Sequence, residues 1–141
     1  MKHLSRADFE KQVFARHKGC CAFCSLKAVD AHHIFERKLF AMQEEPNAGY
    51  FLANGVAVCE GHHWDCETTV LSIEQVLKAC NIEKPCLPSG LAPGKRYDKR
   101  GNVLRSDGLR EPGPLFEDMG CRRALKAGGF LGLFVPAGTP E

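Results

Sequence analysis

The chain has 141 residues, of which 44% are hydrophobic, and a formal net charge of +2. This length fits one domain, or one domain with an extension, and provides a modest core. The N-terminal residues lack the apolar stretch of a secretory signal, and no later run is long enough to span a membrane. We therefore expect a cytoplasmic protein without a membrane partner, and the small net charge excludes a chain-wide electrostatic attraction to nucleic acid.

The first predicted element is a helix over residues 6–17. Ser5 is a suitable N-cap, and Phe9 and Val13 are four residues apart, so that they share one helical face. Gly19 follows as a stop signal. The helix should therefore end just before the first cysteines.

Two short strands are predicted next, over residues 28–35 and 54–59. The second begins at an Asn-Gly pair, which is a turn signal. Pro46 and Asn47 interrupt the longer segment between the strands. The two strands should form a ribbon, with adjacent histidines near the end of the first.

Two helices should follow the ribbon, over residues 61–69 and 71–80, and Ser72 and Gln75 have the spacing of a capping box in the second. The prolines and glycines beyond them cannot continue a helix, so we place a domain boundary near residue 84. The order helix, strand, strand, helix, helix predicts an α+β module over residues 1–84.

Residues 85–141 form a basic, Pro/Gly-rich extension. Residues 95–105 predict a hairpin that turns at 98–101, and residues 114–135 predict a short helix followed by an apolar run. We expect this extension to pack on the module or to contact nucleic acid.

Two pairs of ligands have the spacing of a tetrahedral zinc site. Cys21 and Cys24 are separated by two residues, as are Cys59 and His62. Cys20 is an alternative donor, because three intervening residues before Cys24 are also tolerated. Without a secretory signal, eight cysteines favour metal binding over disulfides. We therefore predict a structural Zn²⁺ site, and the other cysteines are interpreted as core residues: Cys66, Cys80, Cys86 and Cys121.

Two known zinc modules do not fit the intervals. A finger with two cysteines and two histidines places its histidines about twelve residues after the second cysteine, whereas His32 and His33 follow Cys24 after only seven. A zinc nucleobase deaminase needs a His-x-Glu motif, but two residues separate His33 from Glu36.

The sequence from residue 20 to 68 contains His32-His33, then Asn54, then His63 directly after the second ligand pair. This set resembles the zinc-bearing branch of the HNH (His-Me finger) nucleases. The resemblance implies a small, zinc-stabilised ββα-metal module in which His32 and His63 bind a catalytic divalent cation. It also implies that His33 is the general base and that Asn54 orients it.

The chemistry agrees with these implied roles. A neutral imidazole accepts a proton from water at neutral pH, and a cation stabilises charge on phosphate oxygens. Glu67 lies four residues after His63 on the same helical face and is a further candidate ligand. A carboxylate ligand favours Mg²⁺ or Mn²⁺, although Ni²⁺ or Zn²⁺ also suits imidazole ligands.

One geometric condition must hold for His32 and His33 to act together. Neighbouring residues on a regular strand point to opposite faces, so the site requires a strand end, a bulge or a strong twist. Asp30 shares the face of His32 and is interpreted as a solvated carboxylate or an outer partner of that histidine.

The resemblance implies double-stranded DNA as the substrate of a metal-dependent endonuclease. The alternatives are a non-catalytic, zinc-dependent DNA-binding or regulatory protein with a degenerate HNH fold, and a structural module of a larger assembly. The small size would suit a phage or mobile-element protein in a bacterial host. The candidate phosphate contacts, which are otherwise ordinary solvated charges, are Arg37, Lys38, Lys95, Arg96, Lys99 and Arg100.

Overall fold

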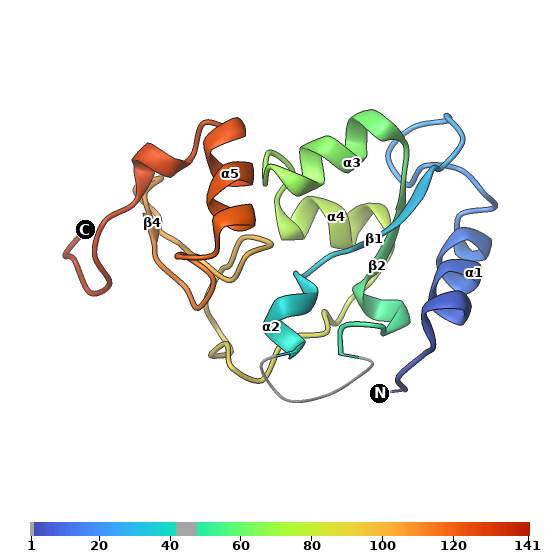
Figure 1. Ribbon diagram of the computed structural model, residues 1–141, viewed down its shortest axis with the longest axis horizontal. Coiled ribbons are helices and arrows are strands. Elements are labelled where there is room, and N and C mark those ends of the chain that lie inside the picture. The colour runs from blue at the N-terminus through green and yellow to red at the C-terminus, as the bar shows by residue number, and fades with distance from the viewer. Residues whose placement is uncertain (1, 42–47) are drawn as a thin grey trace.

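The computed structural model describes residues 2–41 and 48–141. Figure 1 shows short helices around two small antiparallel sheets, and the predicted α+β class is confirmed. The helices are α1 (Arg6–Arg16), α2 (Arg37–Ala41), η1 (Leu52–Asn54), α3 (Glu60–Glu67), α4 (Ile73–Ala79), α5 (Met119–Ala127) and η2 (Leu131–Leu133), of which η1 and η2 are 3₁₀ helices. The strands are β1 (Asp30–His33), β2 (Gly55–Val58), β3 (Val103–Leu104) and β4 (Arg110–Glu111).

β1 and β2 form a two-stranded ribbon that carries the histidine pair. The strands are antiparallel, with Asp30 opposite Val58 and His33 opposite Gly55. Both α1 and α3 pack against this ribbon (Figure 1). The predicted order of elements is confirmed up to α4, except that α2 and η1 were not predicted in the segment between the strands, and Asn54 ends η1 instead of beginning β2.

The helix starts follow from their capping residues. Ser5 caps α1, and its Oγ accepts a hydrogen bond from the Asp8 N–H at 3.1 Å. Ser72 and Gln75 form the predicted capping box at the start of α4, with both reciprocal hydrogen bonds present. These local signals explain why both helix starts were predictable from sequence.

Gly55 permits a close approach between α1 and the ribbon. A Cβ atom at this position would lie 2.8 Å from the Phe9 ring and would overlap the Val13 side chain. The φ angle of Gly55 is −116°, so its backbone is extended and not in a turn conformation. The Asn-Gly pair was interpreted as a turn signal, but its glycine is required for packing.

The segment between the strands contains α2, whose residues Leu39 and Phe40 are buried in the core. The predicted interruption at Pro46 and Asn47 lies outside the described residues. Helix signals in the sequence are weak here, because the helix has five residues and no predicted cap.

The C-terminal part packs on the N-terminal part. Its hairpin turns at residues 98–101, as predicted: the Gly101 N–H donates to the Asp98 carbonyl at 3.1 Å, and Tyr97 pairs with Val103. One hydrophobic cluster contains residues from both sides of position 84, among them Ile34 and Leu115. The extension therefore shares a core with the ribbon and helices.

The described helices are short, and α1, with 11 residues, is the longest of them. In residues 2–41 and 48–141, no helix combines the length and the apolar character needed to cross a bilayer.

Candidate metal centres

Cys21, Cys24, Cys59 and His62 converge, with ligand atoms that all lie within 4.8 Å of one another. Cys24 Sγ lies 3.8 Å from Cys59 Sγ, and His62 Nδ1 lies 3.5 Å from Cys21 Sγ and 3.2 Å from Cys59 Sγ. A tetrahedral zinc ion, with bonds of about 2.3 Å to sulfur and about 2.0 Å to nitrogen, requires S–S distances near ~3.8 Å and S–N distances near ~3.5 Å. The cluster is therefore compatible with a structural zinc site.

Local structure prepares this cluster. Cys59 is the N-cap of α3, and its Sγ accepts a hydrogen bond from the His62 N–H at 3.5 Å. This bond lowers the pKa of the Cys59 thiol. Burial alone would raise the pKa of Cys21, but backbone N–H groups, among them that of Phe23, lower it overall. The lowered pKa values of Cys21 and Cys59 favour the thiolate, which is the form that binds a metal ion.

A second cluster lies on the ribbon and α3. It contains Asp30, His32 and His63, whose ligand atoms also lie within 4.8 Å of one another. Asp30 Oδ2 is 3.6 Å from His32 Nδ1 and 3.5 Å from His63 Nε2. Two imidazoles and one carboxylate in this arrangement suit a divalent transition-metal ion or Mg²⁺.

The structure brings Asp30 into this cluster, although the sequence interpretation assigned it no ligand role. The relevant signal is the i, i+2 spacing of Asp30 and His32, which places both side chains on one face of β1. The nearby His32 ring lowers the pKa of Asp30, so its carboxylate is ionised at neutral pH.

Glu67, the other candidate carboxylate, is engaged elsewhere. One of its oxygens accepts a hydrogen bond from Arg100, and Oε2 lies 3.6 Å from His32 Nε2. Burial raises the pKa of Glu67, but Arg100 outweighs burial and keeps that pKa below its usual value. Glu67 is therefore placed as an outer partner of the His32 ring, on the side away from Asp30.

His32 and His33 lie on opposite faces of β1. The His32 ring contacts that of His63 on α3, with centroids 4.7 Å apart. The His33 ring stacks on Phe9 of α1 at 4.7 Å and meets Tyr50 edge-on at 5.0 Å. Because His33 is the last residue of β1, both rings nevertheless line the same cavities.

Burial keeps both rings neutral. Together with the ammonium of Lys99, it lowers the pKa of His33 to about 3 and that of His32 to about 4. A neutral ring is the form that accepts a proton or binds a metal ion. Nε2 of His33 is buried and has no hydrogen-bond partner among the described residues.

Asn54 does not contact the His33 ring, so the orienting role expected for its amide is corrected. Its side chain accepts a hydrogen bond from the Phe35 N–H at 2.9 Å, and it donates to the carbonyls of Phe35 and Gly49 at 3.2 and 3.1 Å. Its own carbonyl accepts from the Ile34 N–H at 2.8 Å. Asn54 therefore fixes the chain immediately after His33, and it influences that ring only through the backbone.

Replacement of Asn54 with alanine should destabilise the protein by about 2–4 kcal/mol, because buried backbone groups at Phe35 and Gly49 would lose their partners. Urea unfolding measures this loss, and Gln12→Ala, an exposed amide on α1, is the control. A loss of unfolding free energy similar to that of Gln12→Ala would contradict the role of Asn54 in fixing the chain after His33.

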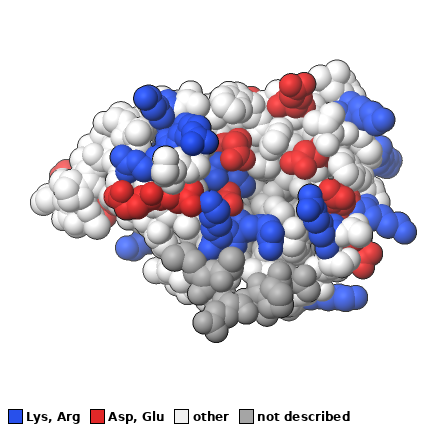
Figure 2. Space-filling model, viewed as in Figure 1, with Lys and Arg blue, Asp and Glu red and all other residues white. Residues whose placement is uncertain are grey.

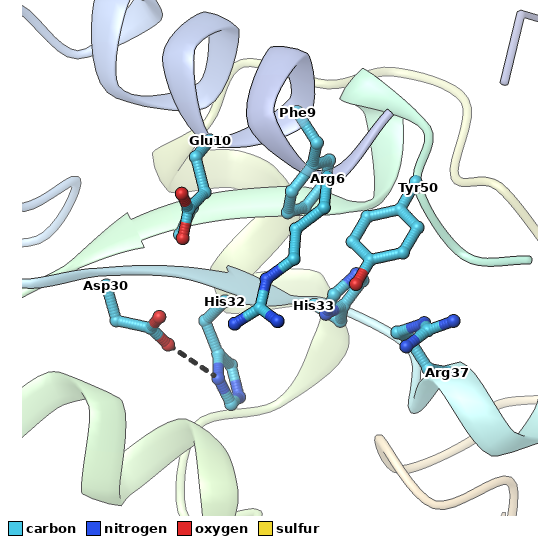
Figure 3. Close-up of a pocket in the computed structure, with 9 residues that line it drawn as sticks. Arg6, Phe9, Glu10, Asp30, His32, His33, Arg37 and Tyr50 are labelled. Carbon is cyan, nitrogen blue, oxygen red and sulfur yellow. Dashed lines mark ion pairs between the residues drawn. The ribbon is translucent and has the colours of Figure 1, made fainter. Parts of the chain in front are cut away.

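Figure 3 shows the cavity of about 260 Å³ between α1 and the ribbon, where Asp30, His32 and His33 lie together. Arg6 from α1 and Arg37 from α2 also line it. A second cavity, of about 370 Å³, shares the two histidines and Arg37 and extends to His63 and Glu67. The metal cluster and the proton acceptor therefore line two cavities that share His32, His33 and Arg37, and Glu10 lies beside the cations of the first.

The six predicted phosphate contacts have different environments. Lys99 and Arg100 are buried, with 5% and 3% of their surface exposed, and both lie against carboxylates inside the protein. This burial does not fit the expectation of exposed phosphate contacts, although Lys99 also lines the cavity of about 370 Å³. Arg96 pairs with Glu74 at 3.0 Å. Lys95 is exposed.

Arg37 and Lys38 lie close to the histidines. The Arg37 guanidinium lies 4.4 Å above the Tyr50 ring, and Lys38 pairs with Asp118 at 2.7 Å. Figure 2 shows acidic and basic side chains interspersed on one face of the molecule. Positive charge near the site therefore comes from a few residues at the cavity, not from a uniformly basic face.

No protein-family model, curated protein or solved structure matches this chain. The resemblance to HNH nucleases therefore remains a prediction that rests on the residues and their geometry.

Proposed function

We propose that this protein is a zinc-stabilised, metal-dependent endonuclease of the HNH type that hydrolyses phosphodiester bonds in DNA. The observation that carries this proposal is the convergence of Asp30, His32 and His63 beside His33 on a strand–strand–helix unit, where both histidines of β1 line two neighbouring cavities. The family's substrate class, double-stranded DNA, enters through the resemblance alone.

In this proposal, Asp30, His32 and His63 would hold the catalytic cation. When bound, a divalent cation supplies positive charge to the phosphate oxygens and the leaving alkoxide. Mg²⁺ and Mn²⁺ suit the carboxylate, while Ni²⁺ or Zn²⁺ also suits the two imidazoles. The Glu67 carboxylate, 3.6 Å from His32 Nε2, would favour that ring electrostatically without a direct hydrogen bond.

The neutral His33 ring would accept a proton from the attacking water as the oxygen bonds to phosphorus and the bond to the leaving alkoxide breaks. Stacking against Phe9 fixes the plane of the ring. Arg6 and Arg37, which line the same cavity, would contact phosphates next to the scissile bond.

Cleavage of supercoiled plasmid by zinc-loaded protein tests the proposal, with magnesium, manganese, nickel or calcium added in turn. We expect conversion only when an added cation is present, and Asp30→Asn should require at least about tenfold more cation than the parent, because a charged ligand is lost. Glu117→Gln is the comparison, since that carboxylate is exposed and lies outside both clusters.

If the folded, zinc-loaded protein converts no plasmid under any cation, the nuclease proposal is wrong. Retarded migration of DNA by the protein in a low-salt gel mobility assay would then support the non-catalytic DNA-binding alternative.

A further inference from the structure

Two buried cations of the C-terminal part reach the candidate catalytic site. Lys99 and Arg100 lie in the turn at residues 98–101, more than 30 residues after α3 in the sequence. Lys99 contacts the end of β1 at His33, and Arg100 contacts Glu67 at the end of α3.

Lys99 holds the end of β1. Its Nζ donates to the His33 carbonyl at 2.5 Å, and its own carbonyl accepts from the Glu36 N–H at 3.1 Å. The Glu36 carboxylate lies 4.0 Å from the ammonium. Lys99 therefore contacts His33 at the end of β1 and Glu36 just after it. The backbone of this short stretch sets the direction of the His33 side chain.

Arg100 connects this stretch to the end of α3. It donates to Glu36 Oε2 at 2.7 Å, to the Glu67 carbonyl at 2.9 Å and to Glu67 Oε1. The other oxygen of Glu67 lies 3.6 Å from His32 Nε2. One guanidinium thus fixes two carboxylates, one of which faces a predicted metal ligand.

The turn that presents these cations is itself held firmly. Asp98 Oδ1 accepts from the N–H groups of Arg100 and Asn102 at 2.9 and 3.0 Å, and Oδ2 accepts from Arg110 at 2.8 Å. Because Asp98 and Asn102 are buried, this network forms without competition from water.

Fold stability alone gives a weak reason for such residues. Removing two charges from water is costly, and apolar residues of similar volume often stabilise a protein equally well or better. The partners of Lys99 and Arg100 are the His33 carbonyl, Glu36 and Glu67, which all adjoin the candidate site.

We propose that Lys99 and Arg100 are positioning residues of the active site, so that the C-terminal part completes it by fixing the end of β1 relative to the end of α3. This inference rests on the proposed nuclease function and deepens it. Lys99 acts on the orientation of His33, and Arg100 acts through Glu67 on the cation ligand His32.

The experiment compares Lys99→Met, Lys99→Arg, Arg100→Met and Arg100→Lys in the full-length, zinc-loaded protein. Single-turnover cleavage at saturating cation, Mn²⁺ affinity by calorimetry and the melting temperature are measured for each. Arg105→Met is the matched control, because Arg105 is also a buried arginine with carboxylate partners, Asp107 and Glu111, within the C-terminal part.

For Lys99→Met we expect a rate that is about 10- to 100-fold lower, because small errors in the placement of a proton acceptor are costly. The melting temperature should fall, because the His33 carbonyl and Glu36 lose a buried partner, so the rates are compared at a temperature where every variant is folded. Lys99→Arg should recover part of the rate. Arg100→Met should weaken Mn²⁺ binding by about tenfold, Arg100→Lys should weaken it less, and Arg105→Met should change neither rate nor affinity.

The inference is overturned if the folded methionine variants match the parent in rate and Mn²⁺ affinity. If a methionine variant does not fold, the Arg100→Lys variant provides the test. An Mn²⁺ affinity of Arg100→Lys equal to that of the parent would contradict the role of the guanidinium. A parent that binds Mn²⁺ but cuts no DNA refutes the nuclease proposal alone, while the affinities still test Arg100. A parent that neither cuts DNA nor binds Mn²⁺ refutes both.

Discussion

Replacement of His33 with alanine should lower the cleavage rate by about 10²- to 10⁴-fold, which is the usual contribution of a general base. The ring is the proposed proton acceptor, and it lies beside the metal cluster, stacked on Phe9 and lining the site cavities. No other histidine among the described residues lies on this face of β1 next to Phe9 and Tyr50. Plasmid conversion over time, at saturating cation, measures the effect.

Packing requires a control, because removal of the His33 ring also removes its contact with Phe9. His33→Phe keeps an aromatic ring in this position but provides no nitrogen, so it should fold well and remain inactive. His17→Ala, at the far end of α1, should cleave like the parent. Equal cleavage by His33→Ala and the parent, prepared identically, would show that His33 is not the base.

Replacement of Cys24 with serine should unfold the module at temperatures where the parent is stable. Structural zinc sites supply on the order of 10 kcal/mol of apparent binding free energy in small domains, and loss of one thiolate removes much of it. The four candidate ligands come from the loop after α1 and from the start of α3, so a zinc ion bound there would connect elements far apart in sequence. Zinc content and thermal melting measure the outcome.

Cys20 provides the matched control for this zinc experiment. It precedes the ligand pair, is exposed, and lies outside the cluster of four ligands. Cys20→Ser should keep both the zinc and the melting temperature of the parent. If Cys24→Ser binds one zinc ion and melts like the parent, then the four-ligand assignment is incorrect.

Elements defined by local signals were predictable. Ser5, Ser72 and Gln75 form hydrogen bonds within three residues of themselves, so their spacing in the sequence is sufficient to locate helix starts. The convergence of the four candidate zinc ligands was also predictable, because two-residue spacing within each pair reflects the geometry of a single turn.

Features that depend on packing between distant segments were not predictable. Whether Asp30 or Glu67 joins the metal cluster depends on Arg100, which approaches Glu67 from 33 residues away. Lys99 and Arg100 were interpreted as surface charges, because a basic hairpin is usually solvated. The sequence does not show that their turn packs beneath the ribbon.

The close approach at Gly55 also protects the molecule from an error during folding. A two-stranded ribbon of four-residue strands can pair in a shifted register, and a shift of one residue moves every side chain to the opposite face. Beside α1, only a residue without a Cβ atom fits between Phe9 and Val13. A shifted β2 would place Asn54 or Val56 at this position, where its Cβ atom would clash with Phe9 and Val13. Packing against α1 therefore favours the register in which His33 is opposite Gly55.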